Sequence, residues 1–219
     1  LGELSLKTTA DTPRTTAHIG VVKKGDNTGL GLVDELAEAG ARFIAKSGDE
    51  LKTFLNGIID LPTGVPYSGK LYRYKPTGAT YSVTDINPYM NPLENRFKTG
   101  LYASTSKNGN LIEVNAYGGT AGKTQYEISN VQLNNVLDLT DEATIKKLGT
   151  SFEQMKLSGV SNKYEYTHEV AYWAKNNGYS GVKFNGAQGS GTVYENIIVF
   201  EQSTVNSSII NSSIDPVSW

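Results

Sequence analysis

The sequence predicts a mixed α+β domain, and three of its features favour that class. Its 219 residues are enough for one large domain with a real hydrophobic core. The 13 Tyr and 23 Gly, against only 2 Met, favour Tyr-rich strands joined by tight turns over a helical bundle. Strand-like and helical apolar patterns both occur along the chain, so we expect helices flanking a sheet.

The composition also excludes several kinds of site. The chain has no Cys, which excludes disulfides, thiol catalysis and thiolate metal sites. Its only histidines, His18 and His168, lie about 150 positions apart, so we expect no metal site. A net charge of −2 predicts no nucleic-acid partner. No run reaches the roughly 18–20 apolar residues of a membrane helix, so we expect no membrane contact in the active domain.

A small helical lead-in is predicted ahead of the main domain. One helical face runs through 32–41, and a second apolar stripe follows the helix start at Ser47. Two prolines and a glycine in 61–66 then interrupt every periodic pattern. We therefore place a boundary there, with a lead-in or linker region over 1–66 and the main domain over 67–219.

The main domain is predicted to mix strands with helices. A strand at 70–75 is followed by a long irregular loop, and the clearest helix covers 166–177, where Gly178 ends it. Further strands are expected at 100–104, 124–128, 131–139, 180–184 and 192–200, with a short helix from Thr140 to Gly149. The spaced apolar residues of the tail, 202–219, indicate that it packs on the body of the fold or on a partner.

The stretch 100–114 contains the first candidate catalytic residue. After its strand and the polar run Ser104-Thr105-Ser106, we expect a loop at 107–110 and a return to an apolar strand carrying Glu113. A carboxylate among aliphatic residues either points to water or is held for a task. Arg73, a single cation in an aromatic strand, favours the second interpretation, because the pair would suit an anionic dinucleotide.

Several short motifs arrive in a recognisable order over about 70–201. They are Arg73-Tyr74, Gly100-Leu101-Tyr102-Ala103, Glu113, and the runs 136–140, 177–182 and 196–200. Together they resemble the RES domain, a family named for an arginine, a glutamate and a serine. The resemblance implies an ADP-ribosyltransferase-like split β-sheet core with flanking helices, and an enzyme that consumes NAD as its substrate and needs no cofactor.

The same resemblance implies roles for individual residues. Arg73 would clamp the diphosphate of NAD, Tyr102 would stack near the nicotinamide, and Glu113 would act on the adjoining ribose, with Tyr74 at the same pocket. The chemistry agrees with these roles, since cleavage of a cationic glycoside requires mainly stabilisation of an oxocarbenium-like transition state. A bidentate arginine is suited to holding a diphosphate. This interpretation requires Arg73 and Glu113 to converge on one cleft.

The chain departs from the family pattern where its serine is expected. That position is Gly186, and the neighbouring Asn185, Gln188 and Ser190 are the candidate polar substitutes. A second alignment, with mono-ADP-ribosyltransferases that carry a Ser-Thr-Ser strand motif, instead uses Ser104 and its neighbours together with Glu195. A third interpretation is a non-enzymatic binding module with a Tyr-rich surface.

The lead-in adds an expectation about delivery. Residues 29–43 resemble the region that precedes the toxin domain in large secreted bacterial polymorphic toxins, and the chain begins with Leu1 rather than Met. The resemblance implies a C-terminal antibacterial effector that is delivered to a target cell and acts in its cytoplasm. It also implies a cognate immunity protein that covers the active site or a nearby face.

Overall fold

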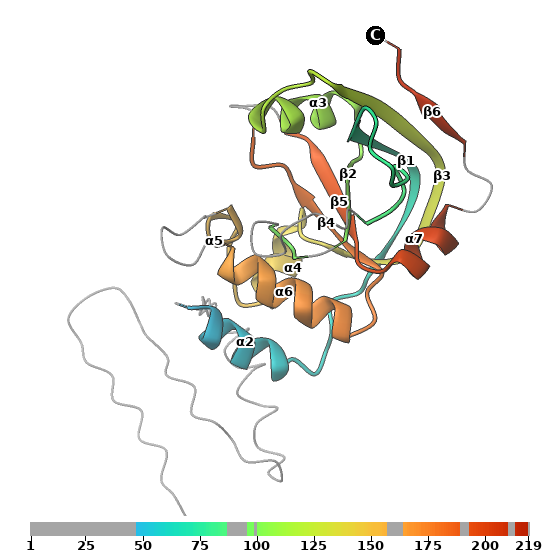
Figure 1. Ribbon diagram of the computed structural model, residues 1–219. Helices are drawn as coiled ribbons and strands as arrows, with labels where there is room; N and C mark the ends of the chain where they lie inside the picture. Colours follow the sequence, from blue (N-terminus) through green and yellow to red (C-terminus); the bar gives the residue numbers. More distant parts are fainter. Residues whose placement is uncertain are drawn as a thin grey trace, which may run out of the picture. The chain divides into compact units, whose positions relative to one another are not determined.

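A curved sheet of six strands organises the part of the chain that the structure describes (Figure 1). This computed structural model describes residues 47–86, 96–98, 100–156, 164–188, 193–209 and 213–218. The strands are β1 (Val65–Pro76), β2 (Leu101–Ser104), β3 (Lys123–Asp138), β4 (Gly181–Asn185), β5 (Glu195–Val199) and β6 (Ile214–Pro216). The helices are α2 (Gly48–Asn56), α3 (Lys107–Ala116), α4 (Glu142–Lys147), α5 (Phe152–Lys156), α6 (Glu165–Asn176) and α7 (Gln202–Ser208). The predicted α+β class is confirmed.

The sheet closes on itself to form a barrel. Its strand order is β1-β2-β5-β4-β3-β6, and β1 also pairs with β3 along almost its whole length. All of these pairings are antiparallel except β3 with β4. Closure leaves β6 as a short outer strand beside β3 and encloses the core within the other five strands.

The two faces of β2 and β5 have different surroundings, because neighbouring side chains along a strand point to opposite faces. The core face carries Leu101, Ala103, Ile197 and Val199, which belong to one buried apolar cluster with Leu71, Val83 and Val205. The opposite face, here called the helix face, carries Tyr102, Ser104, Asn196 and Ile198. Helix α3 packs over this face at β1 and β2, and α6 packs on β4.

One long strand replaces two predicted ones. The expected strands 124–128 and 131–139 are joined in β3, and the break expected between them is a bend at Asn130, whose φ is 55°. Asn tolerates this left-handed conformation better than most residues, so the strand kinks without ending. The partner strand β1 shows a matching register shift between Gly69 and Leu71.

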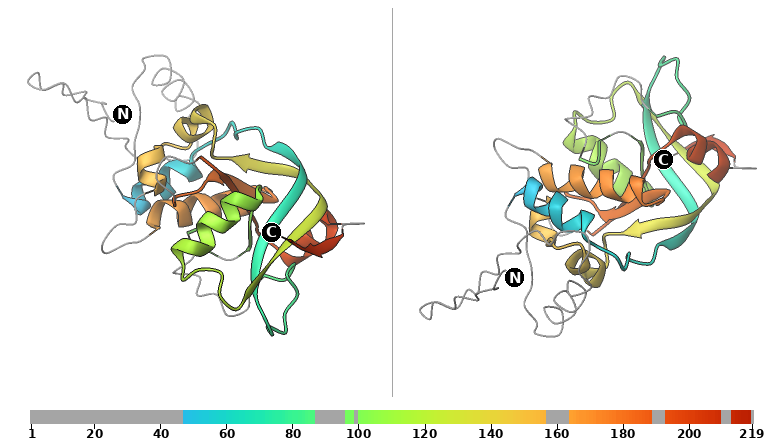
Figure 2. Two further views of the ribbon diagram at one scale, coloured as in Figure 1. Left: turned by 90° about the horizontal axis from the view of Figure 1, so that it is seen from above. Right: turned by 90° about the horizontal axis from the view of Figure 1, so that it is seen from below.

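Helix α2 lies beside α6 in both Figure 1 and Figure 2. Ser47 caps its N-terminus by accepting a hydrogen bond from the amide of Glu50 at 3.2 Å, as the sequence predicted for a helix starting there. The amide of Gly48 donates to the carboxylate of Glu165 on α6. The predicted helix at 32–41 lies outside the described residues, and the domain boundary at 61–66 stays a prediction.

The C-terminal segment packs on the body of the fold. Val205 of α7 is buried in the core cluster, and β6 pairs with β3 through Tyr126, Glu127 and Ile128. Lys107 at the start of α3 donates to the carbonyl oxygen of Ser218 at 2.8 Å. The predicted helix 166–177 corresponds to α6. Among the described residues, no helix has both the length and the hydrophobicity to cross a bilayer.

The N-terminal cap of helix α4 is expected to make the stability of the fold depend on pH in the acid range. Asp141 accepts hydrogen bonds from the amide and the hydroxyl of Thr144, both at 2.8 Å, and the amide bond lowers the pKa of the Asp141 carboxyl most. This cap stabilises the fold fully above the ordinary Asp range near pH 4, and its contribution is lost as pH falls through the lower folded value. Asn also caps helices but does not titrate.

We therefore expect the melting temperature of Asp141→Asn to fall less steeply on acidification than that of the wild type. Thermal melts followed by circular dichroism between about pH 6 and pH 2.5 measure the difference. Parallel curves for the two proteins would contradict it.

Candidate active site

Glu113 lies on a helix, not on the strand that the sequence predicted. Residues 107–116 form α3, where a loop and an apolar strand were expected. Ser106 caps this helix by accepting from the amide of Gly109 at 3.0 Å, and the side chain of Gln125 bonds Asn110 at 3.0 Å from β3 below. Capping and these tertiary contacts override the weak helix propensity of Asn and Gly.

The carboxylate of Glu113 is held by two donors from β5 and the residue before it. The hydroxyl of Tyr194 donates to Oε1 of Glu113 at 2.7 Å, and Nδ2 of Asn196 donates to the same oxygen at 2.8 Å. Both donor side chains are buried, Asn196 at 1% exposed and Tyr194 at 6%. These two bonds fix the position of the Glu113 carboxylate on the helix face.

Tyr194 is itself fixed by the neighbouring segment. Its hydroxyl accepts from the amide of Gln188 at 3.1 Å, and its carbonyl oxygen accepts from the amide of Gly186 at 2.8 Å. Burial, followed by the bond to Glu113, raises the pKa of Tyr194 well above its usual value. The hydroxyl therefore stays protonated and remains a donor to the carboxylate at neutral pH.

Tyrosine side chains lie within electrostatic reach of this carboxylate. Tyr102 packs edge-on against Phe184 with ring centroids 5.4 Å apart. Burial raises the pKa of Tyr102 well above its usual value, with the charge of Arg96 opposing and that of Glu113 adding. Tyr117, which is 63% exposed, accepts from the amide of the Gln188 side chain at 3.4 Å. Burial, then Tyr164 and Glu113, raise the pKa of Tyr117, so these groups lie within electrostatic reach of one another.

Arg96 supplies a cation to the same region. Its Nε donates to the carbonyl oxygen of Met155 at 3.1 Å, and Nη1 donates to that of Asn185 at 3.2 Å. The guanidinium lies over the ring of Phe184 at 5.3 Å and over that of Phe97 at 5.7 Å. Backbone bonds and two cation–π contacts therefore fix its position beside the aromatic part of the site.

A small cavity adjoins Arg96. It is lined by Arg96, Phe97, Leu139, Ile145, Phe152, Met155, Phe184 and Asn185, and its volume is about 10 Å³. That volume admits a water molecule but not a nucleotide. A dinucleotide would therefore lie against the surface of the site or displace side chains at its rim. Within the described residues, no group of three or more His, Asp or Glu could hold a metal ion.

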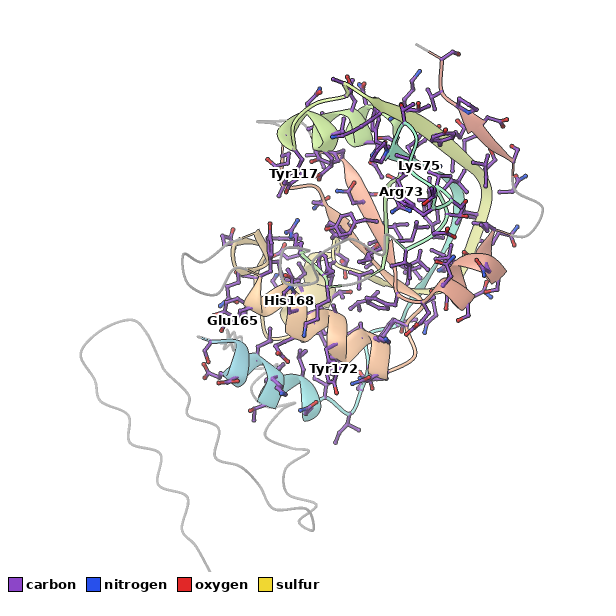
Figure 3. All side chains as sticks on the ribbon, viewed as in Figure 1. Arg73, Lys75, Tyr117, Glu165, His168 and Tyr172 are labelled. Carbon is purple, nitrogen blue, oxygen red and sulfur yellow. The ribbon has the colours of Figure 1, made fainter. Side chains whose placement is uncertain are left out.

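Arg73 is not brought to Glu113. Tyr72 pairs with Ser104 of the helix face, so the next side chain, that of Arg73, points to the core face. Arg73 is 7% exposed, and its Nη1 donates to the carbonyl oxygens of Val83 and Asp85, both at 2.6 Å. In Figure 3 Arg73 lies within the curve of β1 and β3, whereas Tyr117 lies beyond β2 and β5. The convergence that the sequence interpretation required is therefore not observed.

Burial of Arg73 also affects the pKa of its guanidinium. Loss of solvent lowers the pKa of its guanidinium, with the nearby Tyr81 and Asp85 opposing that change. Its two carbonyl acceptors belong to the segment 81–86, which packs on the barrel core through Val83. In this arrangement Arg73 holds a loop against the sheet.

The other residues that the RES resemblance implied lie around the helix face and at the end of β4. Gln188 bonds Tyr194 and Tyr117. Tyr74 pairs with Gln125, whose side chain bonds α3, so Tyr74 also lies on the helix face. Asn185 ends β4, where its carbonyl oxygen bonds Arg96. Ser190 lies outside the described residues.

The residues of the transferase alignment make structural contacts. The hydroxyls of Ser104 and Thr105 both donate to the carbonyl oxygen of Glu195 at 3.1 Å, and the Ser106 hydroxyl caps α3. The carboxylate of Glu195 lies 3.6 Å from Nζ of Lys183, which also pairs with Asp138 at 2.9 Å. Because Glu195 alternates with Asn196, its side chain points to the face opposite Glu113.

Three site residues were missed by the sequence analysis. Arg96 lies in the long irregular loop, and Tyr194 and Asn196 belong to the expected final strand, 192–200, where neither was given a role in the site. A polar Asn between Tyr and a run of Ile was the available signal, since a buried polar side chain in such a strand needs a partner. His168 is buried on α6 with its ring 6.2 Å from that of Tyr164.

Comparison with known proteins gives a similarity in fold. Neither a protein-family model nor a curated protein sequence matches the chain. Among solved structures, a chain of the M. tuberculosis MbcT–MbcA toxin–antitoxin complex is similar, with a TM-score of 0.51 and 14% sequence identity. The similarity covers 77% of this chain and 89% of that chain. The fold is therefore similar to that of a chain in a toxin–antitoxin complex.

Proposed function

We propose that this chain is a toxin domain that cleaves NAD between nicotinamide and ribose. The observation that carries the proposal is the carboxylate of Glu113, anchored by Tyr194 and Asn196 on a face lined with aromatic rings. The order of its motifs, which resembles that of RES domains, and its likeness in fold to a chain of a toxin–antitoxin complex support the same conclusion.

The proposed chemistry needs one well-placed negative charge. As the bond from ribose C1′ to the nicotinamide nitrogen breaks, its electron pair goes to the ring, and nicotinamide leaves as a neutral molecule. Positive charge then develops on the ribose, and the carboxylate of Glu113 stabilises it. The oxygen of a water molecule bonds to C1′, and the proton it loses passes to solvent. Glu113 is also suited to orienting this water.

The aromatic rings and the diphosphate of NAD would contact different side chains. The rings of Tyr102 and Phe184 offer aromatic surface beside the reacting bond, and the exposed ring of Tyr117 offers more at the rim. Arg96 provides a cation over the ring of Phe184, and arginine is well suited to diphosphate oxygens. In this proposal Arg96 takes the role that the sequence interpretation gave to Arg73.

The biological setting is part of the same proposal. The fold similarity to a chain of a toxin–antitoxin complex supports a toxin that is neutralised by a cognate partner protein. We propose that the partner covers the helix face near Glu113, that the domain is delivered as part of a larger secreted protein, and that it depletes NAD in the cytoplasm of a competing bacterium.

Incubation of the purified chain with NAD tests the activity, with products identified by chromatography and mass spectrometry. Equal amounts of nicotinamide and ADP-ribose are expected. Inorganic phosphate is included in one arm, because a phosphorylated ADP-ribose would identify phosphate as the acceptor. Absence of nicotinamide release would end the proposal, and ADP-ribose attached to a macromolecule would replace it with a transferase.

A further inference from the structure

We propose that Tyr194 is a positioning residue that gives the two oxygens of Glu113 different roles. Its hydroxyl anchors Oε1, so that Oε2 is the oxygen presented to the reacting ribose. Gly186 enables this arrangement by leaving room for the Tyr194 ring. The inference rests on the proposed function and assigns roles within the same site.

The position of the Tyr194 ring is fixed by two glycines. A Cβ on Gly186 would lie 2.0 Å from the ring atoms Cε2 and Cζ, and one on Gly109 would lie 2.8 Å from Cδ2. Neither distance is compatible with a side chain while the ring keeps its place. Gly186 belongs to the segment after β4 and Gly109 to the first turn of α3, so the ring is held between two separate elements. We infer that the absence of a side chain at 186 is a requirement of this site.

The direction of the Tyr194 hydroxyl is fixed as well. A tyrosine hydroxyl has one proton to donate. Because the amide of Gln188 donates to the oxygen at 3.1 Å, the hydroxyl proton is free to point to Glu113 at 2.7 Å. The chain of bonds therefore runs in one direction, from the backbone of residue 188 through Tyr194 to the carboxylate.

Both donors converge on the same carboxylate oxygen. Tyr194 and Asn196 each donate to Oε1, at 2.7 and 2.8 Å, and one carboxylate oxygen can accept two hydrogen bonds. Within the described residues, the hydrogen bonds from Tyr194 and Asn196 thus hold the same oxygen of Glu113. A carboxylate held in this way has one oxygen with a purely structural task and one for the substrate.

The test is Tyr194→Phe, which keeps the ring and removes the hydroxyl. We expect kcat for nicotinamide release to fall roughly 10- to 100-fold, because a small misplacement of a catalytic group has effects of that size. KM for NAD should change less than about threefold, since the ring surface is kept. Tyr67→Phe is the matched control: its hydroxyl donates to the carbonyl oxygen of Lys70 at 2.6 Å, away from Glu113, so kcat should stay unchanged.

A second variant tests the role of Gly186. Gly186→Ala keeps the Tyr194 hydroxyl but displaces its ring, so it should also lower kcat with little change in KM. In the Tyr194→Phe background the same substitution should have a clearly smaller effect on kcat, because the bond that it disturbs is already absent. Gly186→Ala also provides the measurement if Tyr194→Phe does not give folded protein by circular dichroism.

The outcomes separate this inference from the proposed function. A wild type that releases no nicotinamide contradicts the proposed function itself. An active wild type whose kcat is unchanged in Tyr194→Phe overturns only the positioning role. Independent, multiplicative effects of the two substitutions would overturn the link between Gly186 and Tyr194.

Discussion

Glu113→Gln is expected to lower nicotinamide release from NAD by roughly 100- to 1,000-fold, the usual effect of removing one group that stabilises transition-state charge. Glutamine has nearly the same shape, so the change removes the negative charge with little loss of packing. Its amide oxygen can also accept the two hydrogen bonds that Tyr194 and Asn196 donate to Oε1, so the anchoring contacts can be kept. Steady-state kinetics with NAD measures kcat and KM, and thermal melting checks that the variant is folded.

Glu195→Gln is the matched control for that variant. Glu195 lies on β5 next to Asn196, which bonds Glu113, but it pairs with Lys183 on the opposite face and is 40% exposed. We expect its activity to stay within about twofold of the wild type, since exposed ion pairs contribute little. A transferase of the Ser-Thr-Ser type predicts the reverse pattern, with Glu195→Gln inactive and Glu113→Gln active.

Arg73→Met is expected to destabilise the fold while leaving substrate affinity unchanged. The substitution removes two hydrogen bonds from a buried guanidinium and leaves the carbonyl oxygens of Val83 and Asp85 without that donor. Each buried acceptor left unpaired costs about 1–3 kcal/mol, so we expect a loss of about 3 kcal/mol in the free energy of unfolding. For a chain of this size the melting temperature should fall by roughly 6–12 °C.

Kinetics of the folded Arg73→Met protein separate two roles. If Arg73 holds the segment 81–86 against the barrel, KM for NAD at low temperature should match that of the wild type. Lys75→Met, two positions along β1, is the matched control and should alter the free energy of unfolding by less than about 1 kcal/mol. A large rise in KM for Arg73→Met without loss of stability would instead support the diphosphate role that the motif order implied.

Sequence reasoning identified the parts of this fold that local patterns encode. The helix 166–177 and the strands that became β1, β2, β4 and β5 carry clear periodicity, with Gly178 marking the helix end. Helix α3 has no such pattern, since Lys-Asn-Gly-Asn reads as a turn. It forms because Ser106 caps it and because Gln125, contributed by another strand, bonds Asn110.

The site was only partly predictable for a related reason. Tyr102 and Glu113 were identified from short motifs close together in the chain, whereas their contacts come from distant segments. Which face of a strand a residue occupies depends on pairing and register, and this alternation separates Arg73 from Glu113. Arg96 lies in an irregular segment and Tyr194 immediately precedes β5, and at neither position does periodicity indicate which groups the side chain approaches.

The sequence separation within the Glu113 site has a consequence for synthesis. Its two anchoring donors lie 81 and 83 positions further along the chain. Domains fold from the N-terminus as they are translated, and β5 emerges from the ribosome long after α3. A nascent polypeptide therefore lacks the assembled carboxylate site until β5 has emerged, so the proposed activity cannot appear before that stage of translation.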